Sequence, residues 1–252
     1  TGGRGIAVQL GAQLTLERAV LTDNHDVGLF VESGAAVTAT DVLIARTQPE
    51  ADGTGGRGIN VQTGAHLTLE RAAITDNHDI GLFAADAGTT VTATEVLVAR
   101  TQPRADGTGG RGIAVQRGAQ LTLERVALTH NHEIGFFTEG AGTTATATEV
   151  LITRTLPEAD GTVGRGASAQ DGAQLTLERA AVTDNYEIGL YAANTGTTVS
   201  ATEVLIARTQ PLPDGTFGRG IGVQKGAQLT LERGLVTDNH SVGLFADGPG
   251  TV

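Results

Sequence analysis

The sequence contains no cysteine, methionine or tryptophan, and aromatic residues make up only 3% of its 252 positions. Without cysteine the chain has no disulfides, thiolate metal sites or cysteine nucleophiles. A conventional globular core would need more large apolar side chains than this chain carries. The 36 glycines instead indicate a narrow and regularly packed core.

Basic residues and long apolar runs are also scarce. The formal net charge of −11 argues against a nucleic-acid-binding protein, because such proteins need a basic stripe along the phosphate backbone. No apolar run approaches the roughly 20 residues of a membrane-spanning helix. We therefore expect no nucleic-acid partner and no membrane span in this chain.

The most prominent feature that is present is a tandem repeat of 53 or 54 residues. Each unit splits into two similar halves, and each half contains two stretches in which apolar and polar residues alternate. This alternation predicts β-strands. The sequence Arg-Gly-Ile or Arg-Gly-Ala marks the repeats at residues 4–6, 57–59, 111–113, 165–167 and 219–221.

The half-repeats predict coils of a solenoid whose strands stack in parallel. A five-bladed propeller is the alternative, because each unit has four strand-like runs. The similarity between the halves favours coils over blades. The coils are predicted to begin at ten glycines that should stack in one column, namely Gly5, Gly28, Gly58, Gly81, Gly112, Gly135, Gly166, Gly189, Gly220 and Gly243.

The half-repeat resembles the right-handed β-helix repeat of the pectin-lyase-like superfamily. The pattern that carries the resemblance is Asn, a short turn, Gly-Ile-x-Val, a glycine turn, Leu-Thr-Leu and a second Asn, and it covers the whole chain. The resemblance implies an all-β fold, a right-handed parallel β-helix of about ten coils in five two-coil repeats, with residues 1–252 as a single domain. Similar copies occur in very large bacterial surface proteins. Because both ends lie inside a repeat, we expect a segment of a longer array.

Stacking of the coils would place equivalent residues in rows along the solenoid axis. Two rows alternate in charge at successive coils, and opposite charges one strand apart attract. A slip by one coil would bring like charges together, so the rows would also fix the register. A third row alternates Asn and Thr and is predicted to satisfy backbone groups inside a corner. The rows begin with Arg18, Asp41 and Arg71, with Asp23, Arg46 and Asp76, and with Asn24, Thr47 and Asn77.

One aromatic residue recurs in the second half of every repeat, where the first half has a small residue. The alternation predicts that this row points outward, with rings roughly 10 Å apart. Such rings would stack on sugars or pack against another molecule, and they are the candidate binding site. The alternative is that the second half is shifted by one residue and the rings fill the core. The row consists of Phe30, Phe83, Phe137, Tyr191 and Phe245.

Each repeat also has an Asp-Gly-Thr segment shortly before the marker arginine. An acid near an arginine is reminiscent of the lyases of the superfamily, but an enzyme needs one cleft with non-equivalent groups, and this arrangement occurs four times. We therefore predict turns in which glycine supplies a positive φ, and no catalytic residues. The paired Asp-Asp and the His-Gly segment of the superfamily's galacturonases are not found.

The sequence gives little support for a metal site or for an ice-binding surface. His130 and His132 are the one irregular spot with ligand-type residues, but no third ligand is identifiable, so we expect no metal and no cofactor. Residues 23–26 would hold Ca²⁺ only weakly, because Asn24 is assigned to the corner row. Outward threonine rows raise an ice-binding alternative, but glutamate at every second coil of the adjacent row interrupts the flat neutral face.

The sequence thus predicts a non-enzymatic structural or adhesive module, extracellular or at the cell surface. It would contact polysaccharide or other surface proteins, or associate end to end through uncapped terminal coils. The alternative is a polysaccharide-active protein, lyase-like or glycosidase-like, whose catalytic part lies outside this segment. An enzyme should show one coil or loop that departs from the repeat, and none does.

Overall fold

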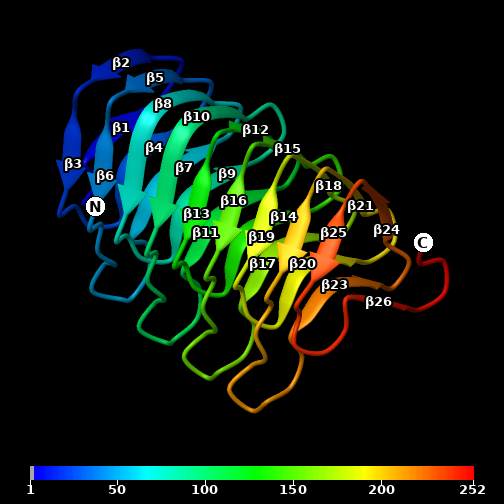
Figure 1. Cartoon of the computed structure of the whole chain (residues 1–252). Coiled ribbons are helices and arrows are strands. Elements are labelled where there is room, and N and C mark those ends of the chain that lie inside the picture. The colour runs from blue at the N-terminus through cyan, green and yellow to red at the C-terminus, as the bar shows by residue number, and fades with distance from the viewer. Residues whose placement is uncertain (1–2) are drawn as a thin grey trace.

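The computed structural model describes residues 3–252, which form an elongated solenoid with the two termini at opposite ends (Figure 1). One wall is sheet A, which receives one strand from each of ten coils, all parallel. We number the coils 1–10 along the chain. The strands of sheet A are β1 (Ile6–Val8), β4 (Val27–Val31), β7 (Arg57–Gln62), β9 (Ile80–Ala85), β11 (Arg111–Gln116), β14 (Ile134–Glu139), β17 (Arg165–Gln170), β20 (Ile188–Ala193), β23 (Arg219–Gln224) and β26 (Leu244–Asp247).

The other walls belong to the 16-stranded sheet B, which has two parallel columns joined where β8 (His66–Thr75) and β10 (Thr90–Ala99) run through both. The first column also contains β2 (Gln13–Glu17), β5 (Ala36–Thr40), β12 (Gln120–Glu124), β15 (Thr144–Thr148), β18 (Gln174–Glu178), β21 (Thr198–Thr202) and β24 (Gln228–Glu232). The second column also contains β3 (Val20–Thr22), β6 (Leu43–Ala45), β13 (Ala127–Thr129), β16 (Leu151–Thr153), β19 (Ala181–Thr183), β22 (Leu205–Ala207) and β25 (Leu235–Thr237).

The ten predicted glycines stack in one column and confirm the coil interpretation over the propeller. A Cβ built on any of the first nine would lie 2.5–2.8 Å from the carbonyl oxygen of the next glycine in the column. At Gly112, for example, it would lie 2.5 Å from the oxygen of Gly135 and 2.8 Å from the amide nitrogen of Asn131. Glycine is therefore required here by the close approach of successive coils.

The core fills the space between the sheets with one inward side chain at every second strand position. In coil 3, Ile59 from sheet A and Ile74 from sheet B are fully buried, and Leu67 and Leu69 are 2% and 1% exposed. Threonine and glutamate at the alternate positions of β8 face solvent. The two-residue period of the sequence thus sets which side chains enter the core.

The Asn/Thr row lies inside a corner, as predicted. Asn131 is 1% exposed, and its Nδ2 donates a hydrogen bond to the carbonyl of Val98 in the preceding coil. Its Oδ1 accepts hydrogen bonds from the backbone N–H and the hydroxyl of Thr101. Asn77 and Asn185 bind the preceding coil through the same amide contacts. Each of these side chains therefore fixes one coil to the one before it.

The charged rows occupy corners where the backbone is left-handed. Arg125 and Glu149 have φ of 53° and 57°, and Asp76 and Arg100 have φ of 57° and 55°. A left-handed conformation costs a residue with a side chain roughly 1–2 kcal/mol. The two corners that carry the charged rows are thus built without glycine, by residues whose side chains project into solvent.

Across residues 3–252, no helix has the length and apolar character needed to traverse a lipid bilayer.

Candidate functional site

The aromatic row lies on the outer side of sheet A, away from the main core. Phe83 and Phe137 pack with Ile80, Ile134 and Ala114 in a small apolar cluster of their own. The alternative of a shifted strand with rings in the main core is therefore wrong. The rings are nonetheless buried, with exposed fractions of 3% for Phe30, 5% for Phe83 and for Phe137, and 8% for Tyr191, while Phe245 in coil 10 is half-buried.

An arginine guanidinium lies over each ring of the row. The arginine is contributed by the preceding coil, close to the start of its sheet A strand. The distance from Cζ to the ring centroid falls within the range of cation–π contacts, about 6 Å. It is 3.7 Å for Arg4 and Phe30, 4.4 Å for Arg57 and Phe83, 4.5 Å for Arg111 and Phe137, 4.1 Å for Arg165 and Tyr191, and 4.0 Å for Arg219 and Phe245.

A carboxylate in the same coil as the ring holds four of these five arginines in place, and Ser241 stands at the corresponding position opposite Arg219. Glu133 is 8% exposed and accepts a hydrogen bond of 2.8 Å from Nε of Arg111. A carboxylate this buried needs a compensating charge, which the guanidinium provides. Asp79 and Glu187, 3% and 5% exposed, bind Arg57 and Arg165 in the same way, and Asp26 binds Arg4. We call each set of three residues an Arg–aromatic–acid unit.

These units correct the expectation of an exposed aromatic platform. The rings face outward, as the alternation predicted, but an arginine occupies the outer face of each ring. At Phe83, Phe137 and Tyr191 a sugar would have to displace a guanidinium that is also bound to a buried carboxylate. The Arg column and the acid column were both visible in the sequence. Their convergence on the rings depends on side-chain directions that the repeat pattern does not specify.

The first charge ladder follows the corner between the two columns of sheet B. Its arginines pair with the acid of the preceding coil, as Arg71 does with Asp41 at 2.8 Å and Arg233 with Glu203 at 3.0 Å. The hydrogen bond from Arg71 lowers the pKa of Asp41. The ladder consists of Arg18, Asp41, Arg71, Glu95, Arg125, Glu149, Arg179, Glu203 and Arg233.

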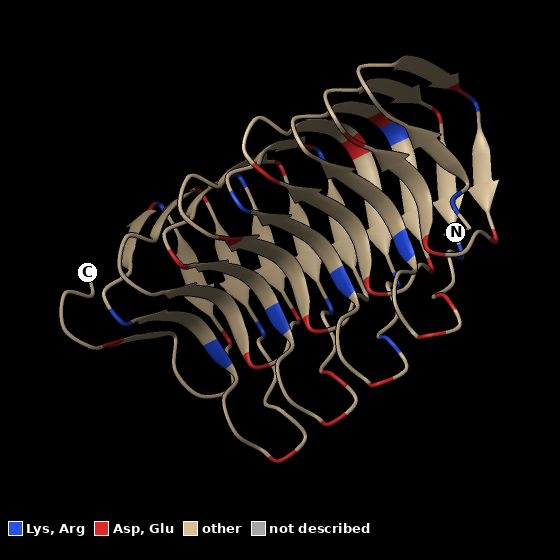
Figure 2. Cartoon of the chain, turned by 180° about the vertical axis from the view of Figure 1, so that it is seen from behind, with Lys and Arg blue, Asp and Glu red and all other residues tan. Residues whose placement is uncertain are grey.

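The second charge ladder follows the corner after the second column of sheet B. Arg46 makes two hydrogen bonds of 2.8 Å to Asp23 and lowers the pKa of that carboxyl to about 2. Figure 2 shows basic and acidic residues recurring along successive coils. The ladder consists of Asp23, Arg46, Asp76, Arg100, His130, Arg154, Asp184, Arg208 and Asp238.

The four long loops carry the Asp-Gly-Thr segments at their tips, which project from one edge of the solenoid (Figures 1 and 2). Asp52 accepts hydrogen bonds from the backbone N–H and the hydroxyl of Thr54, and these bonds lower the pKa of Asp52. The same bonds recur in the other three loops. The glycines of the tips have φ between 82° and 85°, as predicted for turns.

The acid and the arginine that resemble lyase chemistry are therefore engaged separately. Asp52 binds its own turn, whereas Arg57 binds Asp79 and covers Phe83. The corresponding residues of the next two repeats have the same partners. No Asp-Gly-Thr aspartate of residues 3–252 forms an ion pair with one of these arginines.

Comparison with known proteins agrees with this architecture. A family model described as "Right handed beta helix region" matches residues 1–152 and 104–251. The chain belongs to this right-handed β-helix family. Among solved structures, the β-helix is similar to the crystal structure of pectate lyase Pel9A, with a TM-score of 0.53 and 15% identity over 97% of this chain and 72% of that chain.

These findings confirm the predicted right-handed parallel β-helix. The identity to the pectate lyase is low enough that the likeness shows the fold alone. Comparison with curated proteins gave no match.

The two histidines of the irregular segment in this β-helix have separate partners. His132 Nδ1 lies 2.9 Å from the carbonyl oxygen of Thr101 in the preceding coil, a contact that His78 repeats with Thr47. His130 Nδ1 lies 2.8 Å from the hydroxyl of Thr129. Within residues 3–252, no group of three His, Asp or Glu side chains has an arrangement that would hold a metal ion.

A pair of carboxylates that the sequence analysis missed lies near the end of β14. Burial raises the pKa of Glu139, and the neighbouring Asp171 raises it further. Gln116 donates a hydrogen bond of 2.8 Å to Glu139, and Asn194 donates one of 2.6 Å to Asp171. The two acids occupy different columns of the repeat, so neither row identifies the pair.

Proposed function

We propose that this β-helix is a non-enzymatic structural module, a stiff spacer in an extracellular or cell-surface protein. The observation that carries the proposal is that the conspicuous charged groups are engaged with one another in the same way in successive repeats. Arg111 is bound by Glu133 and lies over Phe137, and Arg57 and Arg165 have the same two contacts with their own acids and rings. Recurring and mutually satisfied groups suit a framework more than a reaction centre.

The stiffness expected of a spacer follows from the continuity of the stack. Parallel strands bond successive coils from 1 to 9 through both sheets and coil 10 to coil 9 through sheet A, and the buried asparagines add side-chain bonds at one corner. At about 4.8 Å for each coil, ten coils extend roughly 45 Å. The resemblance of the repeats to those of large bacterial surface proteins supports a place outside the cell.

We assign any adhesive contact, with polysaccharide or with another surface protein, to the outer faces of sheet B. The rings of sheet A are covered by guanidinium groups, whereas Thr68, Thr92 and Thr122 project from successive coils of sheet B and are exposed. The threonine row offers hydroxyl groups at the strand spacing of about 4.8 Å.

A direct assay separates the structural proposal from the polysaccharide-active alternative. The purified chain is incubated with polygalacturonate, pectin and other acidic polysaccharides, with and without Ca²⁺, and the products are followed by ultraviolet absorbance for unsaturated ends and by reducing-sugar release. We expect no turnover. Turnover that disappears in an Arg111→Lys variant with unchanged circular dichroism would overturn the proposal. Affinity electrophoresis in gels containing the same polysaccharides tests the adhesive role independently.

A further inference from the structure

The second column of sheet B presents an apolar row to solvent. In coils 2 to 8 the outward residue of the strand is leucine in the second half of the repeat and alanine in the first half, and Val20 and Leu235 take this position in the flanking coils 1 and 9. Leu97 and Leu151 are 36% and 41% exposed. Strand register places these residues directly above one another along the solenoid axis. We call them the leucine–alanine row, which comprises Leu43, Ala73, Leu97, Ala127, Leu151, Ala181 and Leu205.

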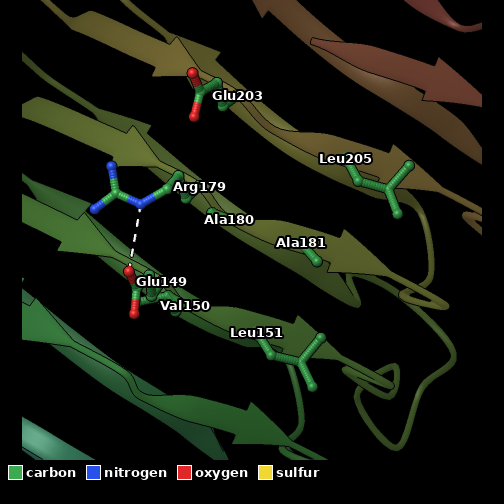
Figure 3. Close-up of a pocket in the computed structure, with 8 residues that line it drawn as sticks. All are labelled: Glu149, Val150, Leu151, Arg179, Ala180, Ala181, Glu203 and Leu205. Atoms are coloured by element: carbon green, nitrogen blue, oxygen red, sulfur yellow. Dashed lines mark hydrogen bonds and ion pairs between the residues drawn. The ribbon is translucent and has the colours of Figure 1, made fainter. Parts of the chain in front are cut away.

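The alternation of large and small residues gives this face a relief of ridges and depressions. Ala181 lies between Leu151 and Leu205 at the floor of an open depression of about 490 Å³. Figure 3 shows the two leucines projecting on either side of it, with Arg179 and Glu149 of the first charge ladder beside them. Ridges recur every second coil, roughly 10 Å apart.

The charges at the two edges of the face change sign together with the alternation of leucine and alanine. In coils 2 to 8 of the first charge ladder, a coil with leucine has an acid and a coil with alanine has an arginine, as in Glu149 with Leu151 and Arg179 with Ala181. In the second ladder the signs are reversed, because Arg154 belongs to the coil of Leu151 and Asp184 to that of Ala181. Within coils 2 to 8, the leucine coils therefore have one order of charges and the alanine coils have the opposite order, whereas coil 9 combines Leu235 with the order of the alanine coils.

We propose that a second copy of this chain docks on the leucine–alanine row with its solenoid axis antiparallel. Rotation about an axis in the face and perpendicular to the solenoid reverses the order of the coils but keeps each ladder opposite the same ladder of the partner. When this rotation axis passes between two coils, every leucine that lies opposite another coil of the row faces an alanine, whereas Val20 and Leu235 in the flanking coils do not follow the alternation. Acid then faces arginine in the first ladder, and basic residue faces acid in the second.

A parallel pair of copies does not achieve this complementarity. Rotation about the solenoid direction places the first ladder opposite the second. Without a shift, the charges then attract but leucine meets leucine. With a shift of one coil, leucine meets alanine but like charges face each other. The antiparallel arrangement therefore matches shape and charge together, and His130 is the one residue of the second ladder that weakens the match.

The size of the face sets the expected strength of the dimer. Seven coils at about 4.8 Å, with a width of roughly 15 Å, offer each copy about 500 Å². The total of about 1,000 Å² lies below the range of stable specific interfaces, about 1,200–2,000 Å², and within that of transient ones. The dimer should therefore be reversible, and raising the salt concentration should weaken it through the ladders.

Sedimentation velocity across protein concentrations tests the association. We expect the wild type to dimerise at micromolar to submillimolar concentration, with several-fold weaker association in 500 mM than in 50 mM NaCl. Leu97→Ser combined with Leu151→Ser should abolish the dimer without loss of fold, because both side chains are partly exposed. Leu10→Ser is the control, since Leu10 is 87% exposed outside this face. A wild type that stays monomeric at submillimolar concentration, or a double variant that still dimerises, overturns the proposal.

Crosslinking tests the direction and the register. The chain has no cysteine, so single variants Leu97→Cys, Ala127→Cys and Ala181→Cys each carry one thiol, and a short bismaleimide will join thiols only across the interface. We expect mixtures of Leu97→Cys with Ala127→Cys or with Ala181→Cys to give heterodimers in preference to homodimers. Preferential homodimers of Leu97→Cys would overturn the antiparallel leucine-to-alanine register.

Discussion

The outer face of sheet A and the leucine–alanine row of sheet B are built from the same kinds of residue. The apolar side chains are covered on sheet A and exposed on sheet B. Both combine arginines, acids and a large apolar residue at every second coil. On sheet A the guanidinium of Arg111 lies over Phe137. On sheet B, Arg179 extends from a left-handed corner toward Glu149 and leaves Leu151 exposed. The position of the arginine relative to the apolar column thus determines whether a surface is sealed.

Truncation of the apolar residue on each face should show the largest contrast. Phe137→Ala removes a ring that is 5% exposed, and we expect a loss of about 3 kcal/mol in the free energy of unfolding. Leu151→Ala, on the open face, should cost less than about 1 kcal/mol, because much of its surface is already hydrated. Urea denaturation followed by circular dichroism measures both. Equal losses would mean that the aromatic units are not sealed.

Neutralisation of the acid on each face should give a smaller contrast. Glu133→Gln leaves the partly buried Arg111 without its counter-charge, and we expect a loss of about 2 kcal/mol, somewhat below the usual cost of breaking a buried pair. Glu149→Gln, whose side chain is 47% exposed, should change stability little, since exposed pairs contribute weakly. Thermal unfolding of the two variants in the same buffer compares them, and the order of their melting temperatures is the result that matters.

Neutralisation of Glu139, which lies beside Asp171 at the edge of sheet A, should raise the stability of the fold, whereas neutralisation of Glu133 lowers it. The pKa of Glu139 is raised by burial and by Asp171, so the folded state favours its protonated form, and its ionisation destabilises the fold at neutral pH. We expect Glu139→Gln to be more stable than the wild type at pH 7. This advantage should disappear as the pH falls below about 4, where the carboxyl is protonated in both states. Denaturation midpoints across pH 3–8 provide the measurement.

Reversal of one rung of the first charge ladder should have the smallest effect. Asp41→Arg places three arginines in succession at positions 18, 41 and 71. The lowered pKa of Asp41 means that its pair with Arg71 is fully effective above the usual carboxyl range and is lost as the pH falls through the lowered value. We expect a slight drop in melting temperature that 0.5 M NaCl removes. A drop that salt does not alter would point to a steric cause.

The solenoid was predictable because each of its features recurs in every coil. The column from Gly5 to Gly243 and the buried row that contains Asn77 and Asn131 follow from periodicity alone. The left-handed corners were not predicted, because Arg125 and Glu149 are not residues that normally signal a positive φ. Periodicity gives the place of a residue in a row, but the backbone conformation at that place depends on the closure of the coil.

The candidate site was less predictable than the fold. The outward direction of Phe83 and Phe137 followed from alternation, but the long arginine side chains that cover them have several rotamers available. The pairing of Glu139 with Asp171 was not visible either. It depends on how β14 and the turn after β17 approach each other at the edge of the sheet. Contacts between different columns require coordinates, whereas contacts within a column require only the repeat length.

The direction in which the ladder arginines reach has a mechanical consequence. In the first ladder each pair joins a second-half coil to the following repeat, as Arg71 does with Asp41, whereas in the second ladder each pair lies within one repeat, as with Arg46 and Asp23. The second ladder is interrupted between coils 5 and 6, where Arg111 and Glu133 supply the link. Every junction from coil 1 to coil 9 is thus crossed by an ion pair, so that tension along this part of the axis meets no junction held by strand hydrogen bonds alone.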